Sequence, residues 1–424
     1  MRLLLSLLLL LSFQWSAAHG QQSTDNVQCS TTQTLFSSAG STVPYRIPTL
    51  VKNKKGELLA FTDYRHCLSD IGFGRVDIHY RISKDNGRTW SPEQTLIEGN
   101  GIEGDNFCGF GDAAVVADSK SNEVLLLCVC GQTPYFQATR DNPNRVAAIR
   151  SHDGGHTWGK PEEITSSIYS LFDDSQLGPV QSLFVGSGKI TQSRTVKKGK
   201  YYRIYAALCA RPGGNRVIYS DDFGHTWHSL GTIHQSPAPL GDEPKIEELP
   251  DGSVLLSSRP GWGNLNSGRF YNIYRGGQWS TAVATADCAG GISAENNVTN
   301  GEILIVKVRK SGSTTLDSKL STLNSQQHLA LQSVPLGPGR SNVGIYWKAL
   351  NSPADYADPE TFATGWSGPY LVTTHDAAYS TMCLQKDGRI GFYWEDTYNG
   401  HGGYEMLYCP LTISTITAGR YEMR

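Results

Sequence analysis

Three arginines stand in sequence contexts that could serve chemistry. Arg46 lies in Tyr45-Arg-Ile-Pro48, Arg259 ends an apolar run that follows an Asp-Gly turn, and Arg340 lies in Gly339-Arg-Ser-Asn342. A guanidinium is a planar fork that donates two parallel hydrogen bonds to a carboxylate and does not deprotonate. Taken singly, each arginine is better explained as a surface charge or a strand-end salt bridge. Their chemistry therefore depends on the elements that position them.

The nine cysteines include one close pair, Cys128-Val-Cys130, at the end of the apolar run that begins at Val124. Strand positions of equal parity face the same way, which favours a buried thiol pair. A zinc site is the alternative, but the chain has no CxxC or HxxxH partner for it. We expect neither a metal nor another cofactor. An odd number of cysteines in an exported chain implies at least one free or intermolecular thiol.

One eight-residue phrase occurs three times, as Ser83-Lys-Asp-Asn-Gly-Arg-Thr-Trp90, Ser151-His-Asp-Gly-Gly-His-Thr-Trp158 and Ser220-Asp-Asp-Phe-Gly-His-Thr-Trp227. The starts are 151−83 = 68 and 220−151 = 69 residues apart. A fixed period indicates a repeat architecture. Asp-x-Gly is typical of a tight turn, and the final tryptophan is predicted to anchor that turn on a core.

The composition favours short strands and tight turns over helices. The 424 residues include 45 glycines and 10% aromatic residues, and runs such as 76–82 and 201–208 are rich in β-branched and aromatic residues. Units of about 68 residues over some 400 residues give about six blades. We therefore predict an all-β fold, a six-bladed β-propeller of four-stranded antiparallel blades, with residues 21–424 as one domain.

The first 20 residues are predicted to be a secretory signal peptide. Arg2 precedes the apolar run 3–11, and small residues follow at 16–18. No later run reaches the ~20 apolar residues of a spanning helix, so we expect an exported, soluble monomer. Its destination, whether the medium, a periplasm or a lysosome-like compartment, stays open. With a net charge of −2, the chain lacks the excess of basic residues that is typical of nucleic-acid-binding proteins.

Tyr45-Arg-Ile-Pro48, combined with the three Asp-box phrases, resembles the exo-α-sialidases, a family of six-bladed propellers. The likeness runs through most of the mature chain, and the segments 72–79, 241–245 and 337–340 are similar to those of secreted bacterial sialidases. The resemblance implies hydrolysis of terminal sialic acid from glycoproteins, glycolipids and oligosaccharides. It also implies retention of configuration through a tyrosyl-enzyme intermediate.

The resemblance also assigns substrate-binding roles. Arg46, Arg259 and Arg340 match the three arginines that clamp the substrate carboxylate in that family. Arg65, in the segment 61–65, matches a fourth arginine that lines the pocket and contacts the sugar. Glu395 matches a carboxylate that braces Arg46, and Asp396 competes with it for that role.

Three further residues match the catalytic groups of the family. Tyr379 is the implied nucleophile, Glu243 its activating base and Asp70 the acid/base. A phenol suits this sugar, because a carboxylate nucleophile would approach the sugar's own carboxylate against like charge. Glu247 and Glu248 compete with Glu243, which we favour because 259−243 = 16 is the family-like distance from Arg259. Asp63 competes with Asp70, which we favour because it stands in a loop.

Three other functions remain possible. A trans-sialidase would keep the same catalytic residues and bind an acceptor sugar through an aromatic side chain such as Trp262, Tyr356 or Trp366. A sialic-acid-binding propeller without catalysis would lack one of Asp70, Glu243 and Tyr379. A purely structural propeller would need none of the strand-end arginines.

Overall fold

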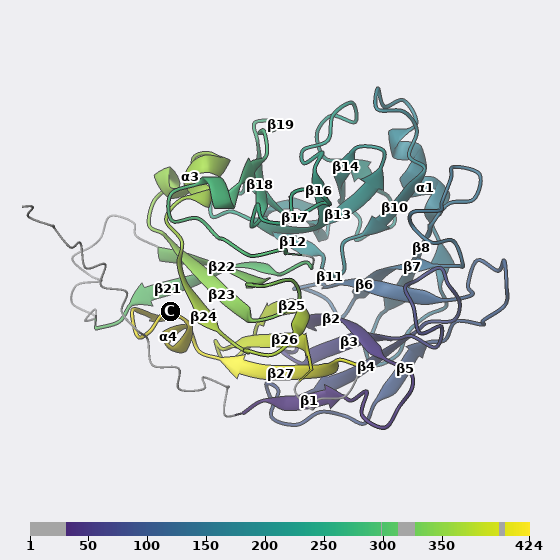
Figure 1. Ribbon diagram of the computed structural model, residues 1–424, viewed down its shortest axis with the longest axis horizontal. Helices are drawn as coiled ribbons and strands as arrows, with labels where there is room; N and C mark the ends of the chain where they lie inside the picture. The colour runs from purple at the N-terminus through teal and green to yellow at the C-terminus, as the bar shows by residue number, and fades with distance from the viewer. Residues whose placement is uncertain (1–30, 298, 313–326, 398–402) are drawn as a thin grey trace, which may run out of the picture.

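The computed structural model describes residues 31–297, 299–312, 327–397 and 403–424. The expected signal peptide of residues 1–20 lies outside this part of the chain. The described residues form six small sheets arranged around a central axis, which confirms the predicted six-bladed propeller (Figure 1). Two sheets have four strands, and the other four add a short or peripheral fifth strand to a four-stranded antiparallel core.

Five blades are built mainly from consecutive segments of chain, with residues 188–189 and 421–423 added to the second and fifth blades from later in the chain. The first contains β2 (Tyr45–Lys52), β3 (Leu58–Tyr64), β4 (Asp77–Ser83) and β5 (Gln94–Ile97). The second contains β6 (Phe110–Ala117), β7 (Val124–Cys130), β8 (Arg145–Ser151), β9 (Glu162–Glu163) and the parallel β11 (Gly188–Lys189). The third contains β10 (Ser182–Val185), β12 (Thr191–Lys198), β13 (Tyr201–Arg211), β14 (Gly214–Ser220) and β15 (His228–Ser229). The fourth contains β16 (Gly241–Glu248), β17 (Val254–Pro260), β18 (Phe270–Arg275), β19 (Gln278–Trp279) and β20 (Val283–Ala284). The fifth contains β21 (Ile303–Lys310), β22 (Gln327–Pro335), β23 (Val343–Leu350), β24 (Ser367–Leu371) and β28 (Tyr421–Met423).

The sixth blade closes the ring with strands from both ends of the described chain. It contains β25 (Ala377–Leu384), β26 (Ile390–Asp396), β27 (Glu405–Leu411) and, as its outer strand, β1 (Gln33–Phe36). The strand β1 pairs antiparallel with β27. Closure in this way joins the two ends of the ring and leaves only short, protected sheet edges.

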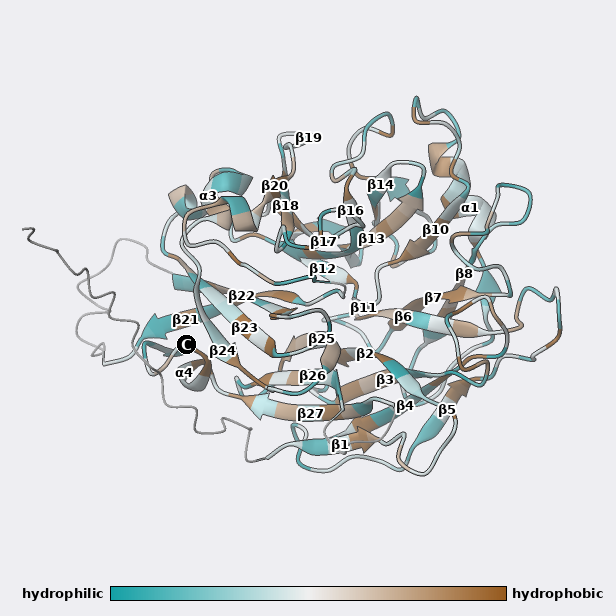
Figure 2. Ribbon diagram, viewed as in Figure 1, coloured by the Kyte–Doolittle hydropathy of each residue, from teal (hydrophilic) through white to brown (hydrophobic). Residues whose placement is uncertain are grey.

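The apolar core is divided among the blade interfaces. Six large clusters of buried residues occur in the described chain, one between each pair of neighbouring blades. In β7, Leu125 and Leu127 pack towards the third blade, whereas Leu126, Cys128 and Cys130 pack towards the first. Both faces of such a strand are buried, which explains its continuous apolar sequence. Figure 2 shows these apolar strands within the blades.

The three repeated phrases form equivalent turns. Each joins the third strand of a blade to the fourth, after Ser83, Ser151 and Ser220. In all three the threonine hydroxyl donates to the aspartate at 2.6 Å. Ser83 pairs with Leu58, at the end of the first blade away from the Arg46–Asp63 pair. The turns therefore lie on the face of the propeller opposite to Arg46.

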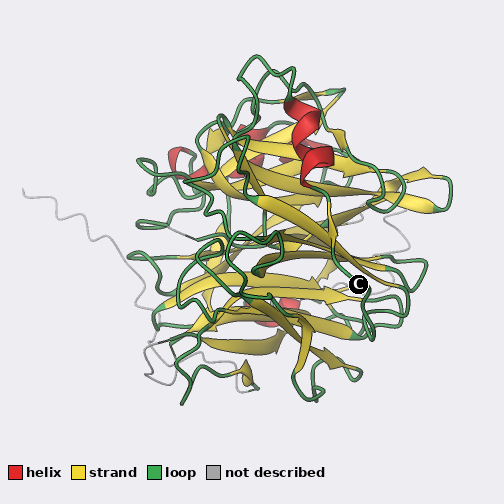
Figure 3. Ribbon diagram, turned by 90° about the vertical axis from the view of Figure 1, so that its right-hand side faces the viewer, coloured by secondary structure: helices red, strands yellow, loops and turns green. Residues whose placement is uncertain are grey.

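Helices are few and short in the described chain, and they cap or connect the blades (Figure 3). They are α1 (Thr165–Tyr169), α3 (Pro359–Ala363), α4 (Ile413–Ile416) and the 3-10 turns η1 (Ser170–Phe172), η2 (Thr285–Asp287) and η3 (Pro353–Tyr356). Among the described residues, no helix has the length and apolar character needed to cross a membrane.

Candidate active site

The site is built at the starts of four inner strands. In β2, β6, β16 and β25 the register with the next strand shifts near the first residues, between Arg46 and Thr49, Gly111 and Ala114, Gly241 and Pro244, and Ala377 and Ser380. A bulge re-aims the side chains beside it and is common next to active sites. Arg46, Asp112, Glu243 and Tyr379 all stand at these bulges.

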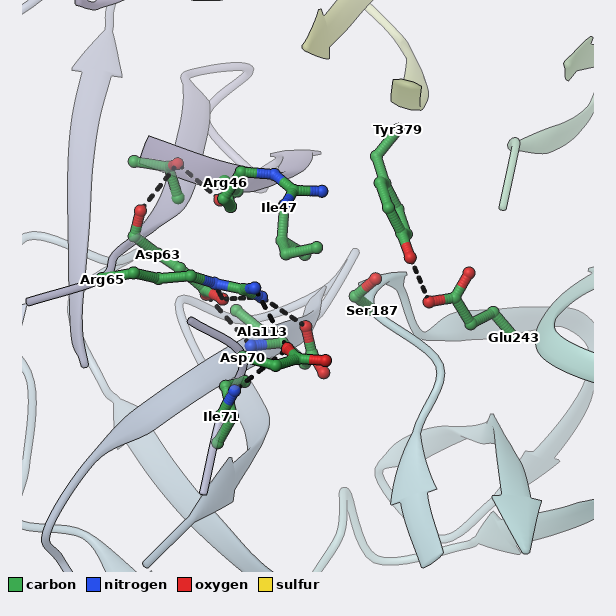
Figure 4. A network of polar contacts seen from close by, with 12 residues as sticks. Arg46, Ile47, Asp63, Arg65, Asp70, Ile71, Ala113, Ser187, Glu243 and Tyr379 are labelled. Carbon is green, nitrogen blue, oxygen red and sulfur yellow. Dashed lines mark hydrogen bonds and ion pairs between the residues drawn. The ribbon is translucent and has the colours of Figure 1, made fainter. Parts of the chain in front are cut away.

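Tyr379, on the sixth blade, and Glu243, on the fourth, form a hydrogen-bonded pair. The Tyr379 hydroxyl donates a short hydrogen bond to Glu243 Oε1. Figure 4 shows these two side chains facing each other, with Arg46, Arg65 and Asp70 on the other side of the site. A carboxylate in contact with a phenol can take its proton, which is the arrangement of a nucleophile with its base.

Cationic groups surround the tyrosine. The guanidinium carbons of Arg46 and Arg340 lie 5.7 Å and 5.6 Å from the centre of the Tyr379 ring. Arg259 Nη1 lies 2.9 Å from Glu243 Oε2. Burial raises the pKa of the Tyr379 phenol well above its usual range, the Glu243 charge adds to this, and Arg259 and Arg340 oppose it. The phenol is therefore neutral until its proton is withdrawn.

A buried carboxylate holds Arg46 in place. Glu395 Oε1 accepts from Arg46 Nε at 2.8 Å and from the Ile47 backbone N–H at 2.7 Å, and Glu395 Oε2 accepts from Arg46 Nη2 at 3.3 Å. The same Oε2 accepts from the Tyr379 backbone N–H at 3.3 Å. Glu395 thus fixes Arg46 and the backbone of Tyr379 together.

On the side of the site away from Tyr379 and Glu243 (Figure 4), Arg65 forms ion pairs with three aspartates. Its guanidinium lies 3.0 Å from Asp63 Oδ2, 3.0 Å from Asp70 Oδ1 and 3.7 Å from Asp112 Oδ1. The Asp63 side chain is fully buried, whereas that of Asp70 is 72% exposed. Asp70, in the loop after β3, is consequently the more exposed of the two carboxylates.

Part of this group of residues borders an open pocket of about 650 Å³. Its lining includes Arg46, Arg65, Asp70, Arg340 and Tyr404. This volume is within the usual range for small-molecule sites. Arg46, Arg65, Asp70 and Arg340 of the predicted set therefore face one cavity, whereas Tyr379, Glu243 and Arg259 are not among the residues that line it.

The carboxylates that competed with Glu243 and Glu395 in the sequence have other partners. Glu247 is bound by Lys189 at 2.6 Å and by Arg194 at 3.0 Å, and Glu248 accepts from the Arg194 backbone N–H at 3.0 Å. Asp396 is bound by His375 Nδ1 at 3.0 Å and by the Trp394 indole at 2.8 Å. The contacts to Tyr379 and to Arg46 are thus made by Glu243 and Glu395.

Two residues that contact this group were missed from the sequence. Asp112 N–H donates to Asp63 Oδ1 at 3.0 Å, and burial, together with the charge of Asp63, raises the pKa of the Asp112 carboxyl. The Tyr404 ring lies 4.9 Å from the Arg46 guanidinium carbon. No signal in the sequence marks Asp112, because it reaches the site through the bulge of β6 between Gly111 and Ala114.

Of the three aromatic residues named for an acceptor, one is available at the surface. Trp262 is 72% exposed, but Tyr356 and Trp366 are buried in the core between the fourth and fifth blades, so their assignment to an acceptor site was wrong.

Cys128 and Cys130 are free thiols in the core between the first two blades. Within the described chain, no cluster of three or more His, Cys, Asp or Glu side chains could hold a metal ion.

Comparisons with known proteins relate the chain to sialidases. No protein-family model matches the chain. The sialidase of Micromonospora viridifaciens is 28% identical over 370 residues, which cover 83% of this chain and 50% of that protein. The chain spans about half the length of the first curated relatives that it matches.

Two solved structures share the fold. The Hadza microbial sialidase Hz136 has a TM-score of 0.66 and 20% identity, over 88% of this chain and 66% of that one. The intramolecular trans-sialidase of Ruminococcus gnavus has a TM-score of 0.65 and 15% identity, over 88% of this chain and 95% of that one. The relatives in sequence are thus named sialidases, and the neighbours in fold include both sialidases and intramolecular trans-sialidases.

Proposed function

We propose that this chain, a relative of the sialidases in sequence and in fold, is an exported exo-α-sialidase that hydrolyses terminal sialic acid from glycans. The observation that carries the proposal is the short hydrogen bond from Tyr379 to Glu243, with Arg46, Arg259 and Arg340 around it. Three guanidinium groups suit the carboxylate that sialic acid carries on its anomeric carbon.

The first half of the reaction forms a bond to Tyr379. The phenol oxygen attacks the anomeric carbon while its proton passes to Glu243, and the bond to the leaving oxygen breaks as Asp70 protonates that oxygen. A neutral phenol avoids the repulsion that a carboxylate nucleophile would meet from the substrate carboxylate.

The second half releases the sugar with retained configuration. Asp70, now ionised, takes a proton from water, and the water oxygen attacks the anomeric carbon. The bond to Tyr379 breaks, and Glu243 returns the proton to the phenolate. Atoms and charges are then as they were before the first step.

Replacing Tyr379 by Phe tests the proposal. We expect release of the fluorophore from a 4-methylumbelliferyl sialoside to fall about 10³-fold, with unchanged thermal unfolding. Tyr370→Phe, on the outer strand β24, is the matched control and should keep wild-type activity. A Tyr379→Phe enzyme with near wild-type activity, or a wild-type protein that releases nothing, would refute the proposal.

A second candidate function is transfer of sialic acid to an acceptor sugar. Trp262 and Leu240 are 72% and 57% exposed, and the Gly261 N–H donates to the Leu240 carbonyl, which places them together beside the Glu243 and Arg259 ends of β16 and β17. An exposed aromatic ring suits the apolar face of a sugar. Product analysis with lactose as acceptor separates transfer from hydrolysis.

A further inference from the structure

A second layer of buried charge lies beyond the Tyr379–Glu243 pair, two residues further along the same strands. The side chains of Lys245, on β16, and Glu302 are 2% and 0% exposed, and Lys245 Nζ lies 3.9 Å from Glu302 Oε2. Lys245 also donates to the Ser187 carbonyl oxygen. On β25, the Thr381 hydroxyl donates to Glu302 Oε2 at 3.1 Å. Glu302 therefore links the strand of the nucleophile to the strand of the base.

The backbone of Glu302 is held as firmly as its carboxylate. Its N–H donates to Ser333 Oγ at 2.9 Å, and its carbonyl accepts from the Ser333 N–H at 3.0 Å. Ser333 Oγ in turn shares a hydrogen bond of 2.8 Å with Ser380 Oγ. Both residues that follow Tyr379, Ser380 and Thr381, are thus tied to the Glu302 segment.

Charges in this layer reach the proposed base. Burial lowers the pKa of the Lys245 ammonium, and the carboxylates of Glu302 and Glu243 oppose that change. Burying a lysine and a glutamate is costly, and well-packed apolar side chains would often stabilise a fold as well or better. A buried ion pair at this place therefore calls for an explanation beyond stability.

We propose that Lys245 and Glu302 are positioning residues for the reaction, which hold Glu243 and Tyr379 in register and balance the charge beside the base. The inference rests on the proposed function, because it takes Glu243 as the base. The lysine favours the ionised base that accepts the phenol proton. The glutamate limits that effect and fixes the strand of the nucleophile.

Several other charged or titratable groups act on the proposed base, Glu243, and on Lys245. Those that act on or contact Glu243 are Arg259, Asp242, Asp112, Tyr379, Lys245, Cys209 and Arg269. Those that act on Lys245 are Glu302, Glu243, Arg269 and Lys189. Lys245 and Glu302 carry opposite charges, so their removal should move the ionisation of the base in opposite directions.

The test compares Lys245→Met and Glu302→Gln in steady-state hydrolysis of a 4-methylumbelliferyl sialoside over a range of pH. We expect each variant to lose about tenfold in kcat while KM stays within about twofold. The midpoint of the acid limb of the kcat/KM profile should move to a pH about 0.5 unit higher in Lys245→Met, and to a lower pH by a similar amount in Glu302→Gln. A merely structural role would not move the limb in opposite directions.

Lys348→Met is the matched control, because Lys348 is also a buried lysine whose pKa is lowered by burial, but it donates to the carbonyl oxygens of Thr361 and Thr364. It should cost stability without moving the acid limb. Where Lys245→Met does not fold, the double variant Lys245→Met/Glu302→Gln, which leaves no charge unbalanced, replaces it. We expect that variant to have a reduced kcat and an acid limb near that of the wild type.

The outcomes separate this inference from the proposed function. An active wild type whose Lys245 and Glu302 variants keep its kcat and its acid limb would overturn the positioning role alone. Limbs that move in the same direction would also overturn it, as would a double variant with wild-type kcat. A wild type that hydrolyses no sialoside would overturn both proposals.

Discussion

At the scale of single residues, Asp70 differs from the other carboxylates of the site by the exposure of its side chain. Its side chain is 72% exposed, and its contacts are Arg65 Nη1 at 3.0 Å and the Ile71 backbone N–H at 3.0 Å. Asp63, by contrast, is fully buried against the same arginine. An exposed acid at the rim of the pocket can follow the leaving oxygen, whereas a buried one on β3 cannot.

Asp70→Asn should therefore have an effect that depends on the leaving group. A sialyl-lactose needs protonation of its leaving oxygen, whereas a 4-methylumbelliferyl sialoside leaves as a stabilised phenolate. We expect kcat/KM to fall about 10³-fold for sialyl-lactose and about tenfold for the fluorogenic substrate. Asp376→Asn, at another carboxylate of the pocket, should affect both substrates equally. Equal losses for both substrates in Asp70→Asn would contradict the acid role.

Glu395 and Asp396 provide a second residue-scale test, because they are adjacent buried carboxylates with different partners. Glu395→Gln removes the charge that holds Arg46, so we expect KM to rise and kcat/KM to fall about 10- to 100-fold. Asp396→Asn changes contacts to His375 and Trp394 and should leave KM near that of the wild type. Kinetics of both variants on one sialoside decide between them, and a larger rise in KM for Asp396→Asn would reverse the assignment.

At the scale of elements, the inner strands explain which site residues the sequence could indicate. Arg46 and Tyr379 lie in recognisable segments, and Arg259 follows from a strand-end position. Asp112 has no such segment. It reaches the site because β6 bulges after Gly111, and its φ of 55° is one that few residues adopt. A bulge is a property of paired strands, so neither it nor the contact between Arg65 and Asp112 can be derived from one stretch of sequence.

The repeated turns were predictable because each is made by local contacts. Burial opposes ionisation of Asp85 and Asp222, but hydrogen bonds from their Thr and Ser neighbours outweigh it and lower the pKa of each to about 2. Thr89 donates to Asp85 from both its backbone N–H and its hydroxyl. The aspartate thus fixes the turn through its charged form.

Asp85→Asn should destabilise the fold in a pH-dependent way. We expect a loss of about 1 kcal/mol near neutral pH, as charge-assisted hydrogen bonds weaken. A folded-state pKa of about 2, below the unfolded value near 4, gives a stabilisation that is present above about pH 4 and lost as the pH falls towards 2. The difference in Tm between wild type and variant should shrink over that interval in calorimetry.

The control for this prediction is Asp141→Asn, at an exposed aspartate outside the repeated phrases. Its Tm should match that of the wild type at each pH. A Tm difference for Asp85→Asn that is the same at pH 3 and pH 7 would show that the charge of the carboxylate does not act in the turn.

At the scale of the whole molecule, the ring is a set of six cores joined in a circle. The period of 68 to 69 residues indicated the number of blades, because each repeated turn marks one blade. The closure was not predictable, since β1 pairs with β27 across more than 350 residues and its four residues, Gln33–Phe36, form no distinctive pattern. Only the packed structure shows that the sixth blade is shared between both ends of the described chain.

Phe36→Ala tests whether this closure stabilises the entire ring. Phe36 is 1% exposed, lies in the core between the sixth and first blades, and packs against Tyr45 with ring centres 5.4 Å apart. Removing its ring should cost about 3–5 kcal/mol. The neighbouring cores share strands with this one, so we expect a single unfolding transition at lower temperature in calorimetry. Phe136→Ala, at a phenylalanine that is 71% exposed, should change stability by less than about 0.5 kcal/mol. Two separate transitions in Phe36→Ala, with one at the wild-type Tm, would mean that the blades unfold independently and that closure through β1 stabilises only the sixth blade.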